Sequence, residues 1–347
     1  MKKIFVQSVG ILNHKAKEKA ELLEVQATDG SSCVSKACCG TVDCQCLSKK
    51  YCCYVKKAVD FDPTHSMNPK DAKRVDSAIK QVMHAGKECI QESGFHGNVD
   101  FDTVGVYISN IEAISDGIES NFKKFHKIKK MDPLFLPHSL GHMAVGFFSI
   151  EHKLRGPSSA PSCGLLSGLT TLKSAMIAVE EGLCEGAIAG GSSGNMSDLE
   201  MLSLENNNIF KDKVFMEGAA VLSLADEELS NKINKKPMAE LISLDFSFEK
   251  SDLDDSVIFK KIFDKTIEKN DIKKDDIKKV FFNGFDGVVE SSLDVNLYSD
   301  LHRPVGGHAG IQELAYVITK LNGLSGNYIL LVKGDDNYFA SCCFKIG

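Results

Sequence analysis

Short apolar segments of strand length alternate with longer amphipathic segments along most of this chain. Strands separated by helices are typical of an α/β fold, in which helices cover the faces of buried sheets. Apolar residues three and four positions apart mark the helical segments. The sequence predicts strands at residues 3–9, 51–59, 103–108, 187–191, 214–224, 238–247, 279–283, 328–333 and 339–346, and helices at residues 69–92, 167–181, 256–270 and 311–321.

The length and charge of the chain exclude several classes of protein. Its 347 residues suit two modest domains or one large α/β unit. A net charge of −6 gives no basic excess for nucleic acid, and no apolar run reaches the roughly 18 residues of a membrane span. The first residues carry too short an apolar stretch for a signal peptide. We therefore expect a cytoplasmic protein that binds neither nucleic acid nor membrane.

A polar, basic stretch at residues 231–236 lies between two unequal parts of the chain. Composition of this kind is common in linkers between structural units. We therefore expect an N-terminal half at residues 1–235 and a smaller C-terminal half at residues 236–347.

Cysteine is unusually frequent, and seven of the 12 cysteines lie within residues 29–58, a cysteine-rich segment whose first part, residues 29–50, is predicted to be irregular. A disulfide scaffold is typical of short secreted chains, which this chain does not resemble. Structural zinc sites favour CxxC pairs, whereas the closest spacings here are adjacent pairs and one CxC. We expect free thiols and no bound metal or cofactor, with a cysteine-rich metal-binding protein as an alternative. The seven are Cys33, Cys38, Cys39, Cys44, Cys46, Cys52 and Cys53.

Residues 156–168 predict a strand that turns sharply into a helix. The segment begins with Gly156-Pro157, and the helix that follows leads to a strand ending in Ala189-Gly190-Gly191. The start of a helix stabilises a thiolate through its dipole and offers free N–H groups to an oxyanion. This turn is therefore the place where a nucleophile is expected.

The order of several segments resembles the β-ketoacyl synthase family, which has the thiolase fold. The resemblance implies a layered α-β-α-β-α architecture with two pseudo-repeated halves, of which the second is shortened here. It also implies a catalytic cysteine at the turn and two histidines that assist decarboxylation and stabilise the enolate. The segments that carry it are residues 6–11, 59–63, 67–76, 104–108, 134–168 and 214–224, the last with Glu217-Gly218-Ala219.

The residues at the family's catalytic positions do not match its chemistry. Without gaps between Gly156 and Gly191, the cysteine position falls on Leu165. The first histidine position falls on Phe285, within Asn283-Gly284-Phe285-Asp286-Gly287. The second falls on Pro304 when Gly307-His308-Ala309-Gly310-Ile311-Gln312-Glu313 is aligned with the family's motif, and a shift of a few residues would use His302 or His308 instead. The gating turn is replaced by Gly334-Asp335-Asp336-Asn337.

Cys163 offers an alternative nucleophile two residues before Leu165. Period-two alternation along a strand predicts that both side chains lie on the same face, about 6–7 Å apart. An active condensing enzyme with this shifted nucleophile is therefore an alternative, although a small buried thiol is the simpler interpretation of the residue.

Without the family's catalytic residues, this chain resembles the chain length factors. These are catalytically inactive family members that pair with an active ketosynthase. The resemblance implies a heterodimer that shapes an acyl or polyketide tunnel and receives chains from an acyl carrier protein. The chain alone is then not an enzyme. The candidate tunnel and gate residues are Ile111, Glu112, Ala113, Ile114 and Ile118; the candidate interface residues are Ser158, Ser159, Ala160, Pro161 and Ser162; and the candidate carrier-protein contacts are Lys123, Lys124, Lys127, Lys129 and Lys130.

Overall fold

The architecture comes from a computed structural model of the whole chain. The residues that it describes are 2–13, 55–56, 58–110, 115–133, 135, 140–195, 197, 215–249, 253–284, 298–300, 310–334 and 337–347. The seven cysteines at residues 33–53 lie outside these ranges.

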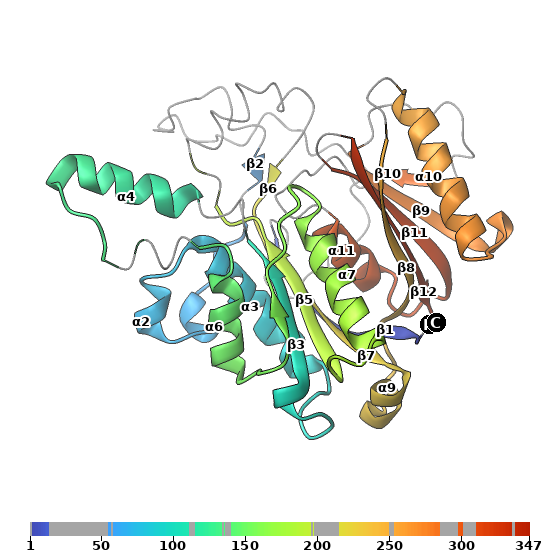
Figure 1. Cartoon of the computed structure of the whole chain (residues 1–347), viewed down its shortest axis with the longest axis horizontal. Helices are drawn as coiled ribbons and strands as arrows, with labels where there is room; N and C mark the ends of the chain where they lie inside the picture. Colours follow the sequence, from blue (N-terminus) through green and yellow to red (C-terminus); the bar gives the residue numbers. More distant parts are fainter. Residues whose placement is uncertain are drawn as a thin grey trace.

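A ten-stranded mixed sheet forms the framework of the molecule (Figure 1). A separate two-stranded parallel sheet pairs β2 (Val55–Lys56) with β6 (Phe215–Met216). In the large sheet the order is β10 (Tyr298–Asp300), β9 (Ile277–Asn283), β11 (Gly326–Lys333), β12 (Tyr338–Ile346), β8 (Ala239–Phe248), β1 (Ile4–Leu12), β7 (Ala219–Asp226), β5 (Gly186–Ser192), β3 (Val104–Ser109) and β4 (Ser158–Ser159).

The strand directions repeat symmetrically about the centre of this sheet. From either end, two parallel pairings are followed by antiparallel pairings that meet at β1 and β8. The central pairing is short, because only Ile4, Phe5 and Val6 of β1 oppose β8. Strands that end by residue 226 occupy one side of it, and strands from residue 239 onward occupy the other. The expected pseudo-repeated halves are thus present.

Helices divide the molecule into layers. On one side, α3 (Ser77–Glu92) and α6 (Met143–His152) pack against the first half of the sheet through an outer apolar core. A central core joins both halves of the sheet around α7 (Ser167–Glu180) and α11 (Ile311–Lys320). A third core lies between the second half and α10 (Asp255–Lys269). This order confirms the predicted α-β-α-β-α fold (Figure 1).

The remaining helices lie at the margins of these layers. The segment 231–236, expected to be a linker, is partly helical. Helix α9 (Glu227–Ile233) includes its first three residues, and Asn234 ends the helix in a left-handed conformation. The division at residue 235 stays a proposal. The helices at the margins of the layers are α2 (Pro69–Ala72), α4 (Ser115–Ile128) and α9 (Glu227–Ile233), with 3-10 turns at Pro63–His65, Phe101–Thr103 and Lys274–Asp276.

Two predicted elements are interrupted. The helix predicted at residues 69–92 breaks before α3, where the side chain of Asp76 accepts a hydrogen bond from the Ala78 N–H and caps a new helix. The strand predicted at 214–224 divides at Gly218, whose φ of +148° favours glycine. A methyl group on Gly218 would lie 2.3 Å from the carbonyl oxygen of Leu12, so close backbone approach also requires glycine there.

The described part of the chain contains no helix that is long and apolar enough to cross a membrane.

Candidate functional site

The start of α7 forms a tight turn at the end of the central layer. Gly164 adopts a φ of +55°, and the Leu166 N–H donates to the carbonyl oxygen of Cys163 at 3.2 Å. The Ser167 hydroxyl fastens this turn: it accepts from the Cys163 N–H at 2.8 Å and donates to the Gly164 carbonyl at 2.6 Å. The sharp strand-to-helix turn expected from the sequence is therefore present.

Aliphatic side chains occupy the inner side of this turn. Leu165 is 4% exposed and Leu166 is fully buried, and both belong to the central core. Cys163 is exposed. The expectation that Cys163 and Leu165 share one face is wrong, because the left-handed conformation at Gly164 replaces strand alternation with a turn. Leu165, the residue that the sequence predicts for the nucleophile position, is thus a buried aliphatic side chain without a reactive group.

A second group of residues approaches the turn from the other half of the molecule. A methyl group on Gly310, the first residue before α11, would lie 2.4 Å from Leu169 Cδ1 of α7. A methyl group on Gly334, in the connection from β11 to β12, would lie 2.7 Å from Leu166 Cγ. The starts of both central helices and the β11–β12 connection therefore meet at one place.

Glu313 is the buried ionisable group at this meeting point. One carboxylate oxygen accepts a hydrogen bond from Asn283 Nδ2 at 2.8 Å, and the other accepts from the Gly310 N–H. Burial raises the pKa of Glu313 to about 7, although both hydrogen bonds favour the ionised form. Glu313 is the last residue of the sequence motif at residues 307–313, but the sequence did not predict a special role for it. Only its burial in the fold makes it unusual.

The end of β3 carries buried polar side chains that the sequence did not single out. Ser109 and Asn110 are fully buried. Within the described residues, the Ser109 hydroxyl and both polar atoms of the Asn110 amide have no hydrogen-bond partner. This position directly precedes the candidate tunnel segment. Of the tunnel candidates, Ile118 is half-buried in α4, whereas Ile111, Glu112, Ala113 and Ile114 lie outside the described residues.

The predicted interface segment lies at one end of the sheet. Only Ser158–Ser159 form a strand, β4, which pairs in parallel with β3. This strand is short and does not continue through the segment, because Pro161 has no N–H to donate to a sheet. Both serines of β4 and Ser162 are exposed, while Ala160 and Pro161 are half-buried.

Helix α4 projects from the body of the molecule (Figure 1). Phe122, Phe125 and Ile128 are spaced along its exposed surface, and Phe122 is 50% exposed. Lys123 pairs with Glu119, and the Lys129 ammonium group lies 5.7 Å from the centre of the Phe125 ring. The apolar and basic side chains of this helix are thus presented together.

Two other predicted catalytic positions, Phe285 and Pro304, lie outside the described residues, as do His302 and His308. Asn283 and Gly284, which begin the first histidine motif, lie at the end of β9, and Gly284 has a φ of +82°. The part of the motif that is described therefore ends beside the buried carboxyl group of Glu313.

Comparison with known families decides the identity of this fold. The family model described as the β-ketoacyl synthase N-terminal domain matches residues 28–220, more than half of the chain. The chain belongs to the β-ketoacyl synthase family. It is 28% identical over 211 residues to the 3-oxoacyl-[acyl-carrier-protein] synthase 2 of Vibrio harveyi, covering 54% of this chain and 50% of that protein. In sequence, the chain spans about half the length of the curated relatives it matches.

Solved structures of β-ketoacyl synthases share the whole fold. The ishigamide ketosynthase/chain length factor superposes with a TM-score of 0.76 at 14% identity, covering 99% of both chains. AntDE:AntF, a type II polyketide synthase acyl carrier protein in complex with its ketosynthase bound to the hexaketide, superposes with a TM-score of 0.75 at 16% identity. It covers 100% of this chain and 99% of that chain. At these identities the similarity establishes the fold.

Proposed function

We propose that this chain is a non-catalytic chain-length-factor subunit. It pairs with an active ketosynthase and shapes the tunnel that holds an acyl or polyketide chain during decarboxylative condensation on an acyl carrier protein. The observation that carries the proposal is Leu165, a buried aliphatic side chain at the turn where the family places its nucleophile. A side chain without a titratable proton or lone pair cannot form the thioester that begins condensation.

The packing around Leu165 supports the proposal that the turn before α7 stabilises the fold rather than catalyses a reaction. Leu165 and Leu166 extend the central core to the start of α7, where Leu166 contacts Gly334 of the β11–β12 connection. Side chains in that arrangement stabilise the fold through burial of apolar surface. The same end of the molecule then serves to hold a partner and its substrate rather than to react with it.

Two exposed features suit a partner subunit. β4 is the last strand of the large sheet, and an edge strand of this kind can pair with a second chain. The projecting α4 presents Phe122, Phe125 and Ile128, and exposed apolar groups on one helix are typical of protein interfaces. We propose that both contact the ketosynthase, with Ile111, Ile114 and Ile118 near the tunnel.

Co-purification with an intact Cys-His-His ketosynthase tests the pairing. The tagged chain is co-expressed with the ketosynthase, and we expect a stable one-to-one complex whose condensing activity requires both chains. Phe122→Asp should disrupt the complex, because burial of a carboxylate in an interface is costly. Val257→Asp, at a 51% exposed position on α10, is the matched control and should leave it intact. A homodimer that condenses acyl chains alone would overturn the proposal.

Cys163 supports a second candidate, an active condensing enzyme with a shifted nucleophile. Its side chain is exposed beside the start of α7. An electrophilic acyl mimic offered to the purified chain distinguishes the two functions. Stoichiometric labelling that is lost in Cys163→Ser, together with condensing activity that is lost in the same variant, would favour the enzyme.

We further propose a cytoplasmic setting and an acidic carrier protein as the donor of acyl chains. The buried thiols of Cys184, Cys342 and Cys343, which form no disulfide within the described residues, suit a reducing compartment. The lysines of α4 and of the two residues that follow it, at positions 123, 124, 127, 129 and 130, form a basic surface that suits an acidic partner.

A further inference from the structure

A hollow with a volume of about 520 Å³ lies on the outer layer, across the sheet from the start of α7. Its walls come from the segment at residues 64–68, from α3 and from the end of α6. A volume of this size is within the range of small-molecule sites. The side chains used below are those of His65, Lys87, His96, Glu151 and His152.

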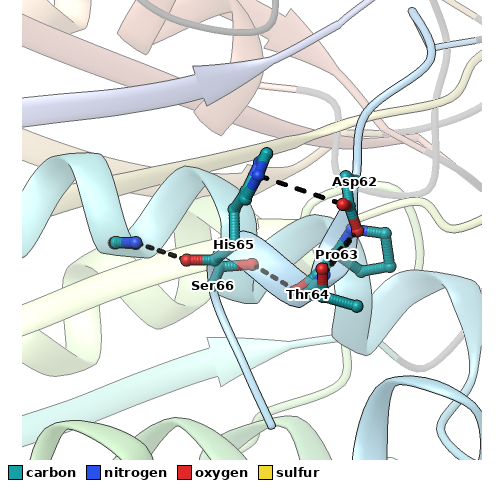
Figure 2. A network of polar contacts seen from close by, with 6 residues as sticks. Asp62, Pro63, Thr64, His65 and Ser66 are labelled. Carbon is teal, nitrogen blue, oxygen red and sulfur yellow. Dashed lines mark hydrogen bonds and ion pairs between the residues drawn. The ribbon is translucent and has the colours of Figure 1, made fainter. Parts of the chain in front are cut away.

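Hydrogen bonds fix the wall formed by residues 62–66 (Figure 2). The Asp62 carboxylate accepts from both the N–H and the hydroxyl of Thr64, at 2.9 and 2.7 Å. The Lys87 ammonium group donates to the carbonyl oxygen of His65 and so ties this wall to α3. An ammonium group has three N–H donors. Lys87 therefore lines the hollow as a positioned cation.

Donors and cations outnumber carboxylates among the lining residues. Three imidazoles and the Lys87 ammonium face one carboxylate, that of Glu151. Within the described residues, His152 Nε2 is buried and has no hydrogen-bond partner. Burial, together with nearby His96 and Lys87, lowers the pKa of His152 to about 4. The surroundings of His152 are thus positive and lack an acceptor.

We propose that this hollow binds a small oxyanion of the phosphate or sulfate type, held by Lys87, His65, His96 and His152. An oxyanion supplies the acceptor that His152 Nε2 lacks, and its charge offsets the cations around it. No group of His, Cys, Asp and Glu side chains in the described ranges is arranged to hold a metal ion, so the imidazoles do not suit a metal centre. The remaining volume accommodates the organic part of a phosphate monoester.

The proposal predicts that binding takes up a proton. A bound dianion favours the imidazolium form of His152. His96 and the α3 residue Lys87 oppose protonation of His152, and Glu151, its neighbour in α6, is the carboxylate among the lining residues. The Asp62 carboxylate oxygen Oδ2 lies 3.9 Å from His65 Nε2 and faces the same wall. Because Glu151 also repels the anion, its neutralisation should improve binding.

Titration of the full chain with sulfate tests the site, because the charge of sulfate is constant between about pH 5 and 8. The readout is the chemical shift of the histidine Cε1–H groups in NMR spectra. We expect saturable shifts of His65, His96 and His152, with affinity about tenfold higher at pH 5.5 than at pH 8, and a raised His152 pKa in the bound state. Phosphate and phenyl phosphate, compared at one pH, then show whether an organic group adds affinity.

Matched variants distinguish sulfate binding at this hollow from nonspecific electrostatic attraction of sulfate to the protein surface. Lys87→Gln should weaken sulfate binding by about tenfold, whereas Lys260→Gln, on the exposed surface of α10, should leave it unchanged. Glu151→Gln should strengthen binding severalfold. Thermal unfolding checks that Lys87→Gln is folded, and His96→Gln, at an exposed position, gives an independent test of weakened binding. Absence of saturation at pH 5.5, or equal effects of Lys87→Gln and Lys260→Gln, would overturn the proposal.

Discussion

The buried carboxyl group of Glu313 predicts an unusual dependence of stability on pH. In the unfolded chain this group ionises near its ordinary pKa of 4.5, whereas burial raises the pKa in the folded protein to about 7. Between these values the folded state binds more protons than the unfolded state. The free energy of unfolding therefore falls as the pH rises through this window and levels off above pH 7.

The magnitude follows from the separation of the two pKa values. Each pH unit corresponds to about 1.4 kcal/mol, so the interval between 4.5 and about 7 predicts a loss of about 3 kcal/mol. Glu313→Gln removes the titration, because an amide stays neutral. Its oxygen can accept from the Gly310 N–H, and rotation of the Asn283 amide allows its new N–H₂ group to donate. We expect the variant to fold.

Urea unfolding at pH 5, 6, 7 and 8 measures the effect. The difference in unfolding free energy between the native protein and Glu313→Gln cancels the titration of other groups. We expect the native protein to lose stability relative to the variant by roughly 2 to 3 kcal/mol between pH 5 and 8, because part of the total loss already occurs below pH 5. A difference that stays constant with pH, or that changes in the opposite direction, would refute the reasoning.

Three further substitutions or reactions test other parts of the structure. Gly10→Ala places a methyl group 1.8 Å from the carbonyl oxygen of Ala85, so we expect a loss of about 3 kcal/mol or failure to fold, measured by thermal unfolding. Asp76→Ala removes the cap of α3 and should cost about 1 kcal/mol, whereas Asp76→Asn should retain most of the stability. Iodoacetamide should modify exposed Cys163 in the folded protein and spare Cys184, whose pKa burial raises to about 11; mass spectrometry of the digest distinguishes them.

Sequence patterns predicted most of the sheet and the central helices, because those elements are buried and clearly bounded. The helix predicted at residues 167–181 corresponds to α7, and the strand predicted at 238–247 corresponds to β8, each within one residue. The break before α3 was missed because apolar spacing continues through it, while the cap at Asp76 depends on one side chain. The division at Gly218 depends on its contact with Leu12, which is distant in sequence.

The sequence predicted where Leu165 lies in the fold, but it did not predict which side chains of the candidate site are buried. Alignment placed Leu165 at the turn before α7, where the structure also places it. The opposite environments of Leu165 and Cys163 were not predicted, because strand alternation does not apply across a left-handed glycine. The raised pKa of Glu313 arises from burial between distant segments, which no local pattern encodes. The proposed roles of Ile111, Ile114 and Ile118 stay predictions.

The pairing of β1 has a consequence for synthesis of the protein. β1 is synthesised well before its pairing partners, which are β7, residues 219–226, and residues 239–241 of β8. Ribosomes add about 5–20 residues per second, so β1 waits roughly 10–40 s for its neighbours. During this interval an apolar strand with both edges unpaired is prone to aggregation. Yield in cells should therefore depend on chaperones that bind the nascent chain before both halves close around β1.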